Sequence, residues 1–354
     1  MIFPQVIWLT LACHLVTGVP LAPSPLQAGT HKYRLAVVAD PDKAGKRGEE
    51  WVSFFREGEL LIQGDSVEVS WGQEQEISNN LAAGGRAMEL SELIMFEENL
   101  LAMDDKTGVV YKLLKEWPGV IVPVPWVILS NGPGNRTRGF KAEWSTVVGE
   151  RLVVGSQGTE WRSKSGGDVM HRDRMWVKMI SSEGAVTHHN WTDSFLAVSE
   201  AAGISSPGYL VHEAVCWSDL RREWTFLPRR MSHSGYDPLT EESLGANIMV
   251  IADENFTTLR TITLGDSSPG RGFSSCKFLP GTEERLLVGL RTEEEGERLE
   301  SFVTVFSVEG EVLLSDTKIG DRKYEGVEII GTVQYIEVED PVNDNIIDDG
   351  EVDV

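Results

Sequence analysis

Residues 139–155 read GFKAEWSTVVGERLVVG. The second half of this stretch is typical of a β-strand, because RLVVG is rich in β-branched residues and ends on a glycine. The first half places Lys141 and Glu143 among residues such as Phe140 and Trp144 that are usually buried. Charged groups in a core strand lose hydration, so this pair requires a compensating partner.

The same arrangement recurs along the chain, as an oxygen-bearing side chain followed by a strand and a tight turn. The five segments are residues 88–105 (MELSELIMFEENLLAMDD), 139–155, 209–228 (YLVHEAVCWSDLRREWTFLP), 272–290 (GFSSCKFLPGTEERLLVGL) and 324–330 (YEGVEII). The oxygen-bearing residues are Ser91 (or Glu92), Glu143, Glu213, Ser274 and Glu325, with separations of 52, 70, 61 and 51 residues. Each separation is roughly the length of one four-stranded propeller blade with its loops.

The rest of the chain consists of short strands separated by turn signals, which indicates an all-β sandwich, barrel or propeller. The repeat favours a five-bladed β-propeller with a central calcium ion, over residues 32–335. The first strand, in YRLAVVAD at 33–40, is expected to complete the blade of the last repeat and close the ring. One helix is expected at 193–202, with Thr192 as its N-cap and Gly203 at its end.

A propeller explains the recurring carboxylates. The innermost strand of each blade lines a central channel, so equivalent positions form a ring around its axis. Three glutamates in such a ring would repel one another and lose hydration. A hard cation with six to eight oxygen ligands compensates both effects, and Ca²⁺ fits a ring of carboxylates, hydroxyls, carbonyls and waters. A single glutamate would more often be an ordinary polar residue, but recurrence in phase with the repeat favours the metal.

The formal net charge of −23 argues against a nucleic-acid surface, because phosphate backbones require a basic stripe. A small phosphate-bearing ligand stays compatible with this charge if cations or a metal ion gather locally. The acidic segment 336–354 is expected to be a disordered tail.

The N-terminus predicts export. Residues 1–30 contain no Asp, Glu, Lys or Arg, and a short apolar run is followed by small residues and prolines. This pattern predicts a signal peptide over residues 1–22, with an uncleaved signal anchor as the alternative. Export favours a secreted protein with no membrane association after cleavage; the lumen of the secretory pathway is the alternative location.

Two further features fit a secretory route. The tripeptides that begin at Asn135, Asn190 and Asn255 are acceptor patterns for N-linked glycans, so a glycoprotein is expected. Outside the signal segment, Cys216 and Cys276 either form one disulfide or remain two buried thiols, and their spacing does not decide between these.

The chain resembles the soluble calcium-activated nucleotidases, the apyrase family. Matching stretches include RLAVVADPD, GRAMELSELIMF, DDKTGVVY, PWVILSNG, GFKAEW, WVKMI, GYLVHEAVCWSD, FLPRR, GANIMV, GFSSCKF and KYEGVEII, in family order from about residue 32 to 330. The resemblance implies an enzyme that hydrolyses nucleoside di- and triphosphates (ADP, UDP, GDP, ATP). It also implies that water would attack the terminal phosphate, with calcium supplying positive charge there, and that inorganic phosphate would be released.

The resemblance also implies a set of calcium ligands, namely Ser91, Glu92, Glu143, Glu213, Ser274 and Glu325. Position 92 is commonly Asp in the family. A backbone carbonyl or water-mediated ligand tolerates Glu there, whereas direct ligation by the carboxylate would be disturbed by the longer side chain.

Phosphoanhydride hydrolysis also requires an oriented water and neutralised phosphate oxygens. Asp40, Asp42 and Asp105 follow apolar strands, so they are candidates to orient or deprotonate water, and the resemblance implicates Asp40 and Asp105 most. An ordinary turn at 104–108 would also explain Asp105.

The candidate cations for substrate binding are Lys141, Lys178, Arg229 and Arg230, with Arg86 a weaker candidate. Arginine suits bidentate phosphate contact, and on a strand only one of the adjacent arginines faces inward, for which we favour Arg229. Trp161 is the candidate platform for the nucleobase. His188 and His189 lack companion ligands and are interpreted as surface residues.

Two other functions are compatible with a propeller. A non-catalytic, calcium-stabilised module could bind nucleotide or a protein partner, but the acids and cations beside the ring argue for an enzyme. A glycosidase would need two carboxylates at a set separation. The sequence leaves open whether the chain forms a homodimer.

Overall fold

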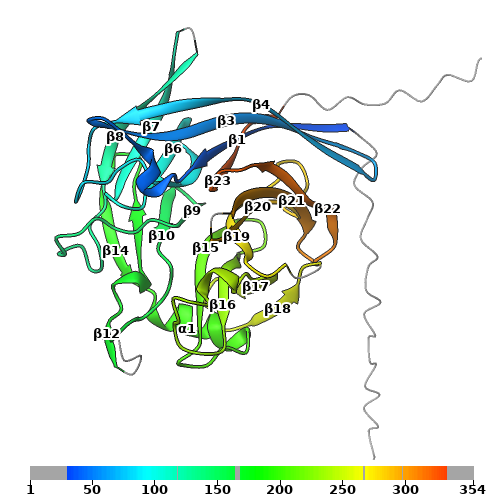
Figure 1. Ribbon diagram of the computed structural model, residues 1–354. Coiled ribbons are helices and arrows are strands. Elements are labelled where there is room, and N and C mark those ends of the chain that lie inside the picture. Colours follow the sequence, from blue (N-terminus) through cyan, green and yellow to red (C-terminus); the bar gives the residue numbers. More distant parts are fainter. Residues whose placement is uncertain (1–29, 118, 164–167, 266–267, 297, 333–354) are drawn as a thin grey trace, which may run out of the picture.

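The computed structural model describes residues 30–117, 119–163, 168–265, 268–296 and 298–332. The predicted signal peptide at 1–22 and acidic tail at 336–354 lie outside these residues. Within the described chain, five antiparallel sheets surround one axis as the blades of a β-propeller (Figure 1). The predicted five-bladed propeller is confirmed.

Each blade is a meander that runs outward from the axis. Blade 1 contains β23 (Tyr324–Thr332), β1 (Thr30–Ala39), β3 (Glu50–Gln63) and β4 (Ser66–Asn79), with β2 (Lys46–Arg47) beside β3. Blade 2 contains β5 (Leu90–Phe96), β6 (Asn99–Asp104), β7 (Val109–Glu116) and β8 (Val120–Ile128). Blade 3 contains β9 (Trp144–Val148), β10 (Arg151–Gly155), β13 (Trp176–Ile180) and β14 (Val186–Asn190).

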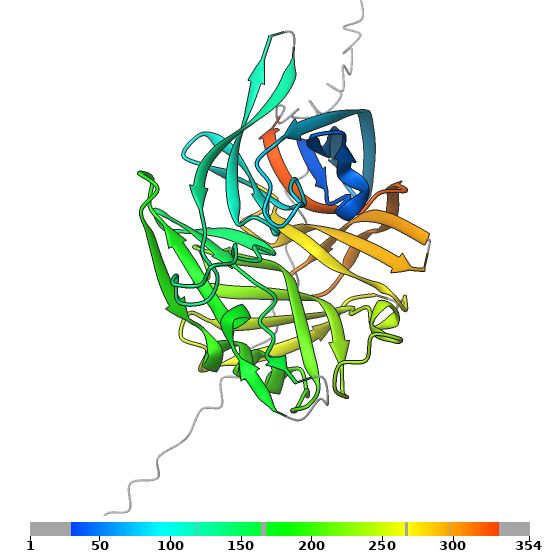
Figure 2. The same cartoon turned by 60° about the vertical axis from the view of Figure 1, so that its left-hand side comes forward.

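The last two blades follow the same order. Blade 4 contains β15 (Tyr209–Ser218), β16 (Glu223–Ser232), β17 (Ile248–Asp253) and β18 (Leu259–Thr263). Blade 5 contains β19 (Arg271–Phe278), β20 (Leu286–Glu295), β21 (Arg298–Ser307) and β22 (Val312–Gly320). The inner strands β5, β9, β15, β19 and β23 contact one another in a closed circle. A second view shows the β7–β8 hairpin extending beyond the other blades (Figure 2).

Several short elements lie between the main strands of the blades. A hairpin of β11 (Trp161–Arg162) and β12 (Val169–His171) interrupts blade 3, and 3-10 turns lie at Asp42–Gly45, Asp173–Met175 and Glu241–Ser243. The predicted helix is present as α1 (Thr192–Ala201), but Thr192 is its first residue rather than its cap. Asn190 Oδ1 accepts the Thr192 N–H at 3.0 Å, so the asparagine side chain satisfies a free donor of the first turn.

The two ends of the described chain close the propeller, as predicted. β1 pairs antiparallel with β23, and Val37 lies opposite Val327. Figure 1 shows this pairing as a blue strand beside a red one. Because the first and last strands share blade 1, the hydrogen bonds of one sheet keep the propeller closed.

Apolar side chains fill the spaces between neighbouring blades. Trp144 is fully buried in a cluster with Val153 of blade 3 and Phe226 of blade 4. Phe140 is fully buried in a cluster with Ile94 of blade 2. The two aromatic residues of the opening stretch therefore anchor blade 3 to both of its neighbours.

A disulfide joins two of the inner strands. Cys216 of β15 is bonded to Cys276 of β19, with 6.3 Å between their Cα atoms. This settles the alternative that the spacing left open. The bond links blades 4 and 5 next to the channel.

The packing between blades 1 and 2 can be tested where the inner strands β5 and β23 approach each other closely. A Cβ added at Gly326 of β23 would lie 2.6 Å from the Glu92 carbonyl carbon of β5, whereas one at Gly331 would meet nothing nearer than 3.9 Å. Gly326→Ala should therefore lower the free energy of unfolding by roughly 3 kcal/mol, and Gly331→Ala by much less. Urea unfolding in EDTA measures both variants, and equal effects would contradict this packing.

Removal of the disulfide should destabilise the protein. The two cysteines are 60 residues apart, and for such a loop chain entropy predicts a loss of about 4 kcal/mol in the Cys216→Ala/Cys276→Ala double variant. Urea unfolding without reductant gives the value. Wild-type protein treated with dithiothreitol is the control and should approach the double variant, while unchanged stability of both would refute the contribution.

Candidate functional site

Four of the five inner strands have a β-bulge at the oxygen-bearing residue of the repeat. In β5 the pairing with β6 skips Ser91, since Leu90 lies opposite Asp104 and Glu92 opposite Met103. The same irregularity falls at Glu213 in β15, Ser274 in β19 and Glu325 in β23. Such β-bulges re-aim a side chain out of the regular alternation of a strand. Glu143 directly precedes β9, and its N–H donates to Gly155 O at 2.9 Å.

We call these five residues the ring, and two of its three carboxylates are nearly excluded from water. Glu143 and Glu325 are 2% and 3% exposed, and Ser91 and Ser274 are also buried. Burial raises the pKa of Glu143 to about 8, against the Lys141 ammonium, which lowers it; the Glu213 and Asp105 carboxylates add smaller increases. Burial likewise raises the pKa of Glu325 well above its usual range. Carboxylates and hydroxyls that are held together away from water are the donor set that a hard cation fits.

Glu92 turns its carboxylate away from the ring. Glu92 Oε1 accepts hydrogen bonds from Lys277 Nζ at 3.0 Å and Ser275 Oγ at 2.8 Å. Its Oε2 accepts the Ser145 N–H at 3.3 Å. Protein donors therefore occupy both carboxylate oxygens of Glu92.

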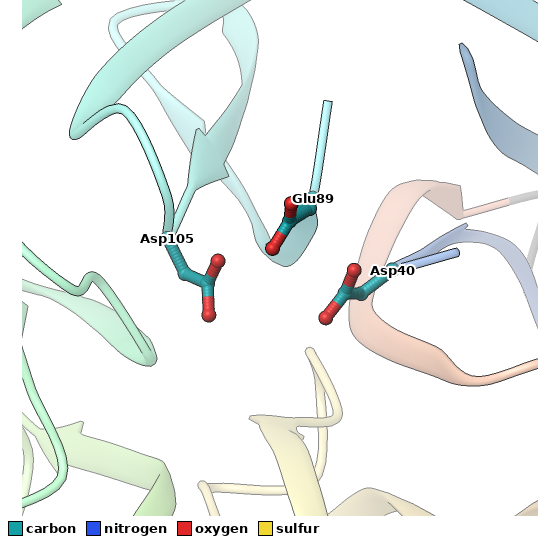
Figure 3. Close-up of side chains that lie close together, drawn as sticks. All are labelled: Asp40, Glu89 and Asp105. Atoms are coloured by element: carbon teal, nitrogen blue, oxygen red, sulfur yellow. The ribbon is translucent and has the colours of Figure 1, made fainter. Parts of the chain in front are cut away.

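A second acidic cluster lies beside the ring. Carboxylate oxygens of Asp40, Glu89 and Asp105 lie within 4.8 Å of one another (Figure 3). Asp40 directly follows β1, Asp105 follows β6, and Glu89 precedes β5. Burial raises the pKa of Glu89 to about 7, although its carboxylate is paired with Arg86. Sequence reasoning missed Glu89, even though it stands two residues before Ser91 in MELSE.

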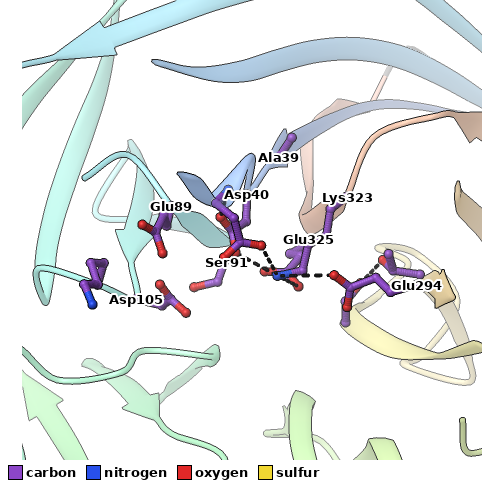
Figure 4. Close-up of polar contacts among 12 residues, drawn as sticks. Ala39, Asp40, Glu89, Ser91, Asp105, Glu294, Lys323 and Glu325 are labelled. Atoms are coloured by element: carbon purple, nitrogen blue, oxygen red, sulfur yellow. Dashed lines mark hydrogen bonds and ion pairs between the residues drawn. The ribbon is translucent and has the colours of Figure 1, made fainter. Parts of the chain in front are cut away.

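Three cations connect the ring to acids outside it. Lys323 Nζ lies 3.1 Å from Glu325 and 2.8 Å from Asp40 (Figure 4). Lys141 pairs with both Glu143, at 2.6 Å, and Asp105.

The third cation is Arg229, which contacts Glu213 at 3.0 Å and Glu294 at 2.6 Å. The sequence analysis missed Lys323. Its signal was the spacing of Lys323 to Glu325, which repeats that of Lys141 to Glu143 and places both side chains on one face.

The other predicted residues lie at the margin of this site. Asp42 is exposed at the rim, where Arg86 pairs with it at 2.7 Å. Arg230 is buried and donates to Glu242 O at 2.7 Å, with Glu294 at 3.5 Å. The pairing of β15 with β16 skips Arg229, so the two arginines do not follow simple strand alternation.

Trp161 lies on the β11–β12 hairpin and is 46% exposed. Its ring stacks on His171 at a centroid distance of 5.8 Å, and the Arg174 guanidinium lies 4.9 Å from its centroid. Burial lowers the pKa of Arg174, while Glu143 and Glu241 act in the opposite direction. Arg174 is therefore within electrostatic reach of the ring, and sequence reasoning missed it because no motif marks it.

Lys178 is not brought to the site. It is fully buried in β13, its ammonium donates to Gly132 O, and its Nζ lies 3.0 Å from His188 Nδ1. Burial lowers its pKa to about 8. The expected phosphate contact is therefore not supported by this placement. His188 is exposed on β14, in agreement with its interpretation as a surface residue.

Comparison with known proteins places the chain. The family profile described as Apyrase matches residues 39–330.

The chain belongs to the apyrase family.

It is 43% identical over 316 residues to soluble calcium-activated nucleotidase 1 of Mus musculus, which covers 88% of this chain and 77% of that protein. The apyrase of Cimex lectularius is 40% identical over 307 residues, covering 84% of this chain and 83% of that protein. Apyrase apy-1 of Caenorhabditis elegans is 39% identical and covers 84% of each chain. The protein is therefore a nucleotide-hydrolysing enzyme, and the non-catalytic and glycosidase alternatives are set aside.

Calcium titration tests the fit of the ring. Glu143→Gln removes a ring charge and should raise the Kd for Ca²⁺ at least about tenfold, because calcium affinity depends on the number of ligand charges. Glu300→Gln is the control, since Glu300 lies on β21 and pairs with Lys318 and Arg298 rather than with the ring. Isothermal titration of EDTA-stripped protein measures both. Equal Kd values for Glu143→Gln and the wild type would show that the ring does not bind the ion.

Proposed function

We propose that this enzyme is a secreted, calcium-dependent hydrolase of nucleoside di- and triphosphates that releases inorganic phosphate. The observation that carries the proposal is one buried assembly in which the ring, the acidic cluster and three cations interlock. Membership of the apyrase family and the similarity to a protein named calcium-activated support it.

The ring residues would hold the calcium ion. Glu143, Glu213 and Glu325 would supply carboxylates, Ser91 and Ser274 hydroxyls, and residue 92 its main-chain carbonyl. When bound, calcium supplies positive charge that neutralises phosphate oxygens and polarises water. The fit rests on the burial of Glu143 and Glu325, which raises the pKa of both, and on the bulges at the other ring residues, Ser91, Glu213, Ser274 and Glu325.

The cations of the assembly would bind the terminal phosphates. Arg229 suits bidentate contact because its guanidinium presents two parallel N–H groups. Lys141 lies between the ring and the acidic cluster, and its ammonium could reach a phosphate oxygen placed there. Both are now paired with carboxylates, so an arriving phosphate would compete with Glu213, Glu143 and Asp105 for them.

The acidic cluster would orient the attacking water. Burial raises the pKa of Asp40, but the Lys323 ammonium, the Asp42 N–H and the Lys141 charge together hold that pKa below its usual range. Asp40 therefore stays ionised and can accept a hydrogen bond or proton from water. Asp105 faces the same gap from blade 2 (Figure 3), so a water between the two carboxylates would be held by both.

Trp161 is proposed to contact the nucleobase. Its exposed ring and the adjacent Arg174 offer an apolar face and a cation at the border of the site. A flat platform of this kind is tolerant of the base, which fits a range of substrates that includes ADP, UDP, GDP and ATP.

Secretion and glycosylation belong to the same proposal. Asn135, Asn190 and Asn255 are all exposed and accessible to a glycosyl donor. In the part of the chain that the structure describes, no helix is both long and apolar enough to cross a membrane. Export to the extracellular space is the favoured location, with the lumen of the secretory pathway as the alternative.

Activity measurements test the proposal directly. Phosphate release from ADP, UDP, GDP or ATP should disappear in EDTA and return with Ca²⁺ but not with Mg²⁺, because Mg²⁺ demands a tighter octahedral site. Asp105→Asn should lower kcat at least about 100-fold if Asp105 handles the water. Asp42→Asn at the exposed rim is the matched comparison and should have a much smaller effect. No phosphate release with any of the four nucleotides in millimolar Ca²⁺ would refute the proposal.

A further inference from the structure

A lysine occupies the channel just beyond the ring. Lys277 follows Ser274 on the same inner strand, and its side chain is only 10% exposed. Its Nζ lies 3.0 Å from Glu92 Oε1 and 3.4 Å from Ser275 Oγ. A fixed ammonium therefore stands in the same channel as the proposed calcium ion.

The carboxylate of Glu92 is bound by three blades at once. Besides Lys277 and Ser275 of blade 5, it accepts the N–H of Ser145 in blade 3 and the N–H of Leu93 in its own blade 2. Glu92 is 1% exposed, so these groups replace its hydration. The carboxylate is thereby fixed away from the ring, although its backbone lies beside Ser91.

Because the Glu92 carboxylate is paired with Lys277, its negative charge is not available to the calcium ion. The carboxylates that then remain for the ion are the three of the ring, those of Glu143, Glu213 and Glu325. Glu328 of β23 is a second buried carboxylate and accepts the Met95 N–H at 2.8 Å. Lys277 also attracts Glu328, so it serves two buried carboxylates.

We propose that Lys277 lowers the calcium affinity of the ring, by neutralising Glu92 and withholding its carboxylate from the ion. This rests on the proposed function, because calcium in the ring is part of it. Calcium affinity rises with the number of ligand charges, and a fixed cation in a poorly hydrated channel opposes a second cation. A ring weakened in this way fills only where calcium is abundant, and extracellular calcium modules have Kd values of about 10⁻⁴ to 10⁻³ M.

A purely structural lysine would behave differently. Loss of its hydrogen bonds would loosen blade 5, so Lys277→Met would bind calcium more weakly or as before, together with a lower Tm in EDTA. Under our proposal the same substitution makes calcium bind more tightly. The sign of the change in Kd therefore separates the two roles, even if Tm falls in both cases.

The test is isothermal titration of Ca²⁺ into the full, EDTA-stripped protein at pH 8 without nucleotide. Lys277→Met should lower Kd at least about tenfold, and Glu92→Gln, which leaves the ammonium unneutralised, should raise it. Lys277→Arg keeps the charge and should stay within about threefold of the wild type. The double variant Lys277→Met/Glu92→Gln removes both charges and should also return to within about threefold, since the two effects offset.

The outcomes of this titration distinguish a failure of the proposed function from a failure of this inference. If the wild type binds no calcium, the proposed function fails. If the wild type binds calcium but Lys277→Met leaves Kd equal or higher, this inference fails and the proposed function stands. A double variant that loses calcium binding would show that the Glu92 carboxylate is itself a ligand, which also overturns the inference. Where Lys277→Met is too unstable to titrate, Lys277→Gln replaces it, and the calcium concentration that gives half of the maximal thermal shift provides the same comparison.

Discussion

Repulsion among buried carboxylates at the propeller axis is the constraint on which the rest of this structure depends. Glu143 and Glu325 are buried and Glu213 is partly buried, and each of the three pairs with a cation that also contacts an acid outside the ring. Apolar packing between blades and the shared blade of β1 and β23 keep them there. We propose that a cation at the axis compensates these like charges. Under this proposal, the groups that bind phosphate and water are arranged around that cation.

The sequence predicted the features that repeat. Five strands, each with an oxygen-bearing residue in phase, were sufficient to predict the five blades and the inner-strand positions of the ring residues. The closure of the propeller by β1 was predicted as well. The buried aromatic residues Phe140 and Trp144 also followed from their residue type. The enzyme class came from the family resemblance rather than from periodicity, because no short motif in the chain specifies nucleotide hydrolysis.

The features that sequence reasoning missed depend on side-chain direction and on contacts between distant segments. Lys178 alternates inward on β13, yet it faces Gly132 and the ring of Phe140 instead of the site. Glu89 joins Asp40 and Asp105 only because blades 1 and 2 bring three strand ends together. Lys277 and Glu92 are 185 residues apart, so nothing local in the chain indicated their pairing. Such contacts form only when the propeller closes, so no single strand predicts them.

The most direct test of the central claim is the position of the ion itself. Anomalous diffraction from crystals soaked in CaCl₂ should show one calcium on the axis, coordinated by the carboxylates of Glu143, Glu213 and Glu325. The carboxylate of Glu92 should remain on Lys277. Calcium held instead by Asp40, Glu89 and Asp105, or an axis without an ion at saturating calcium, would contradict the account.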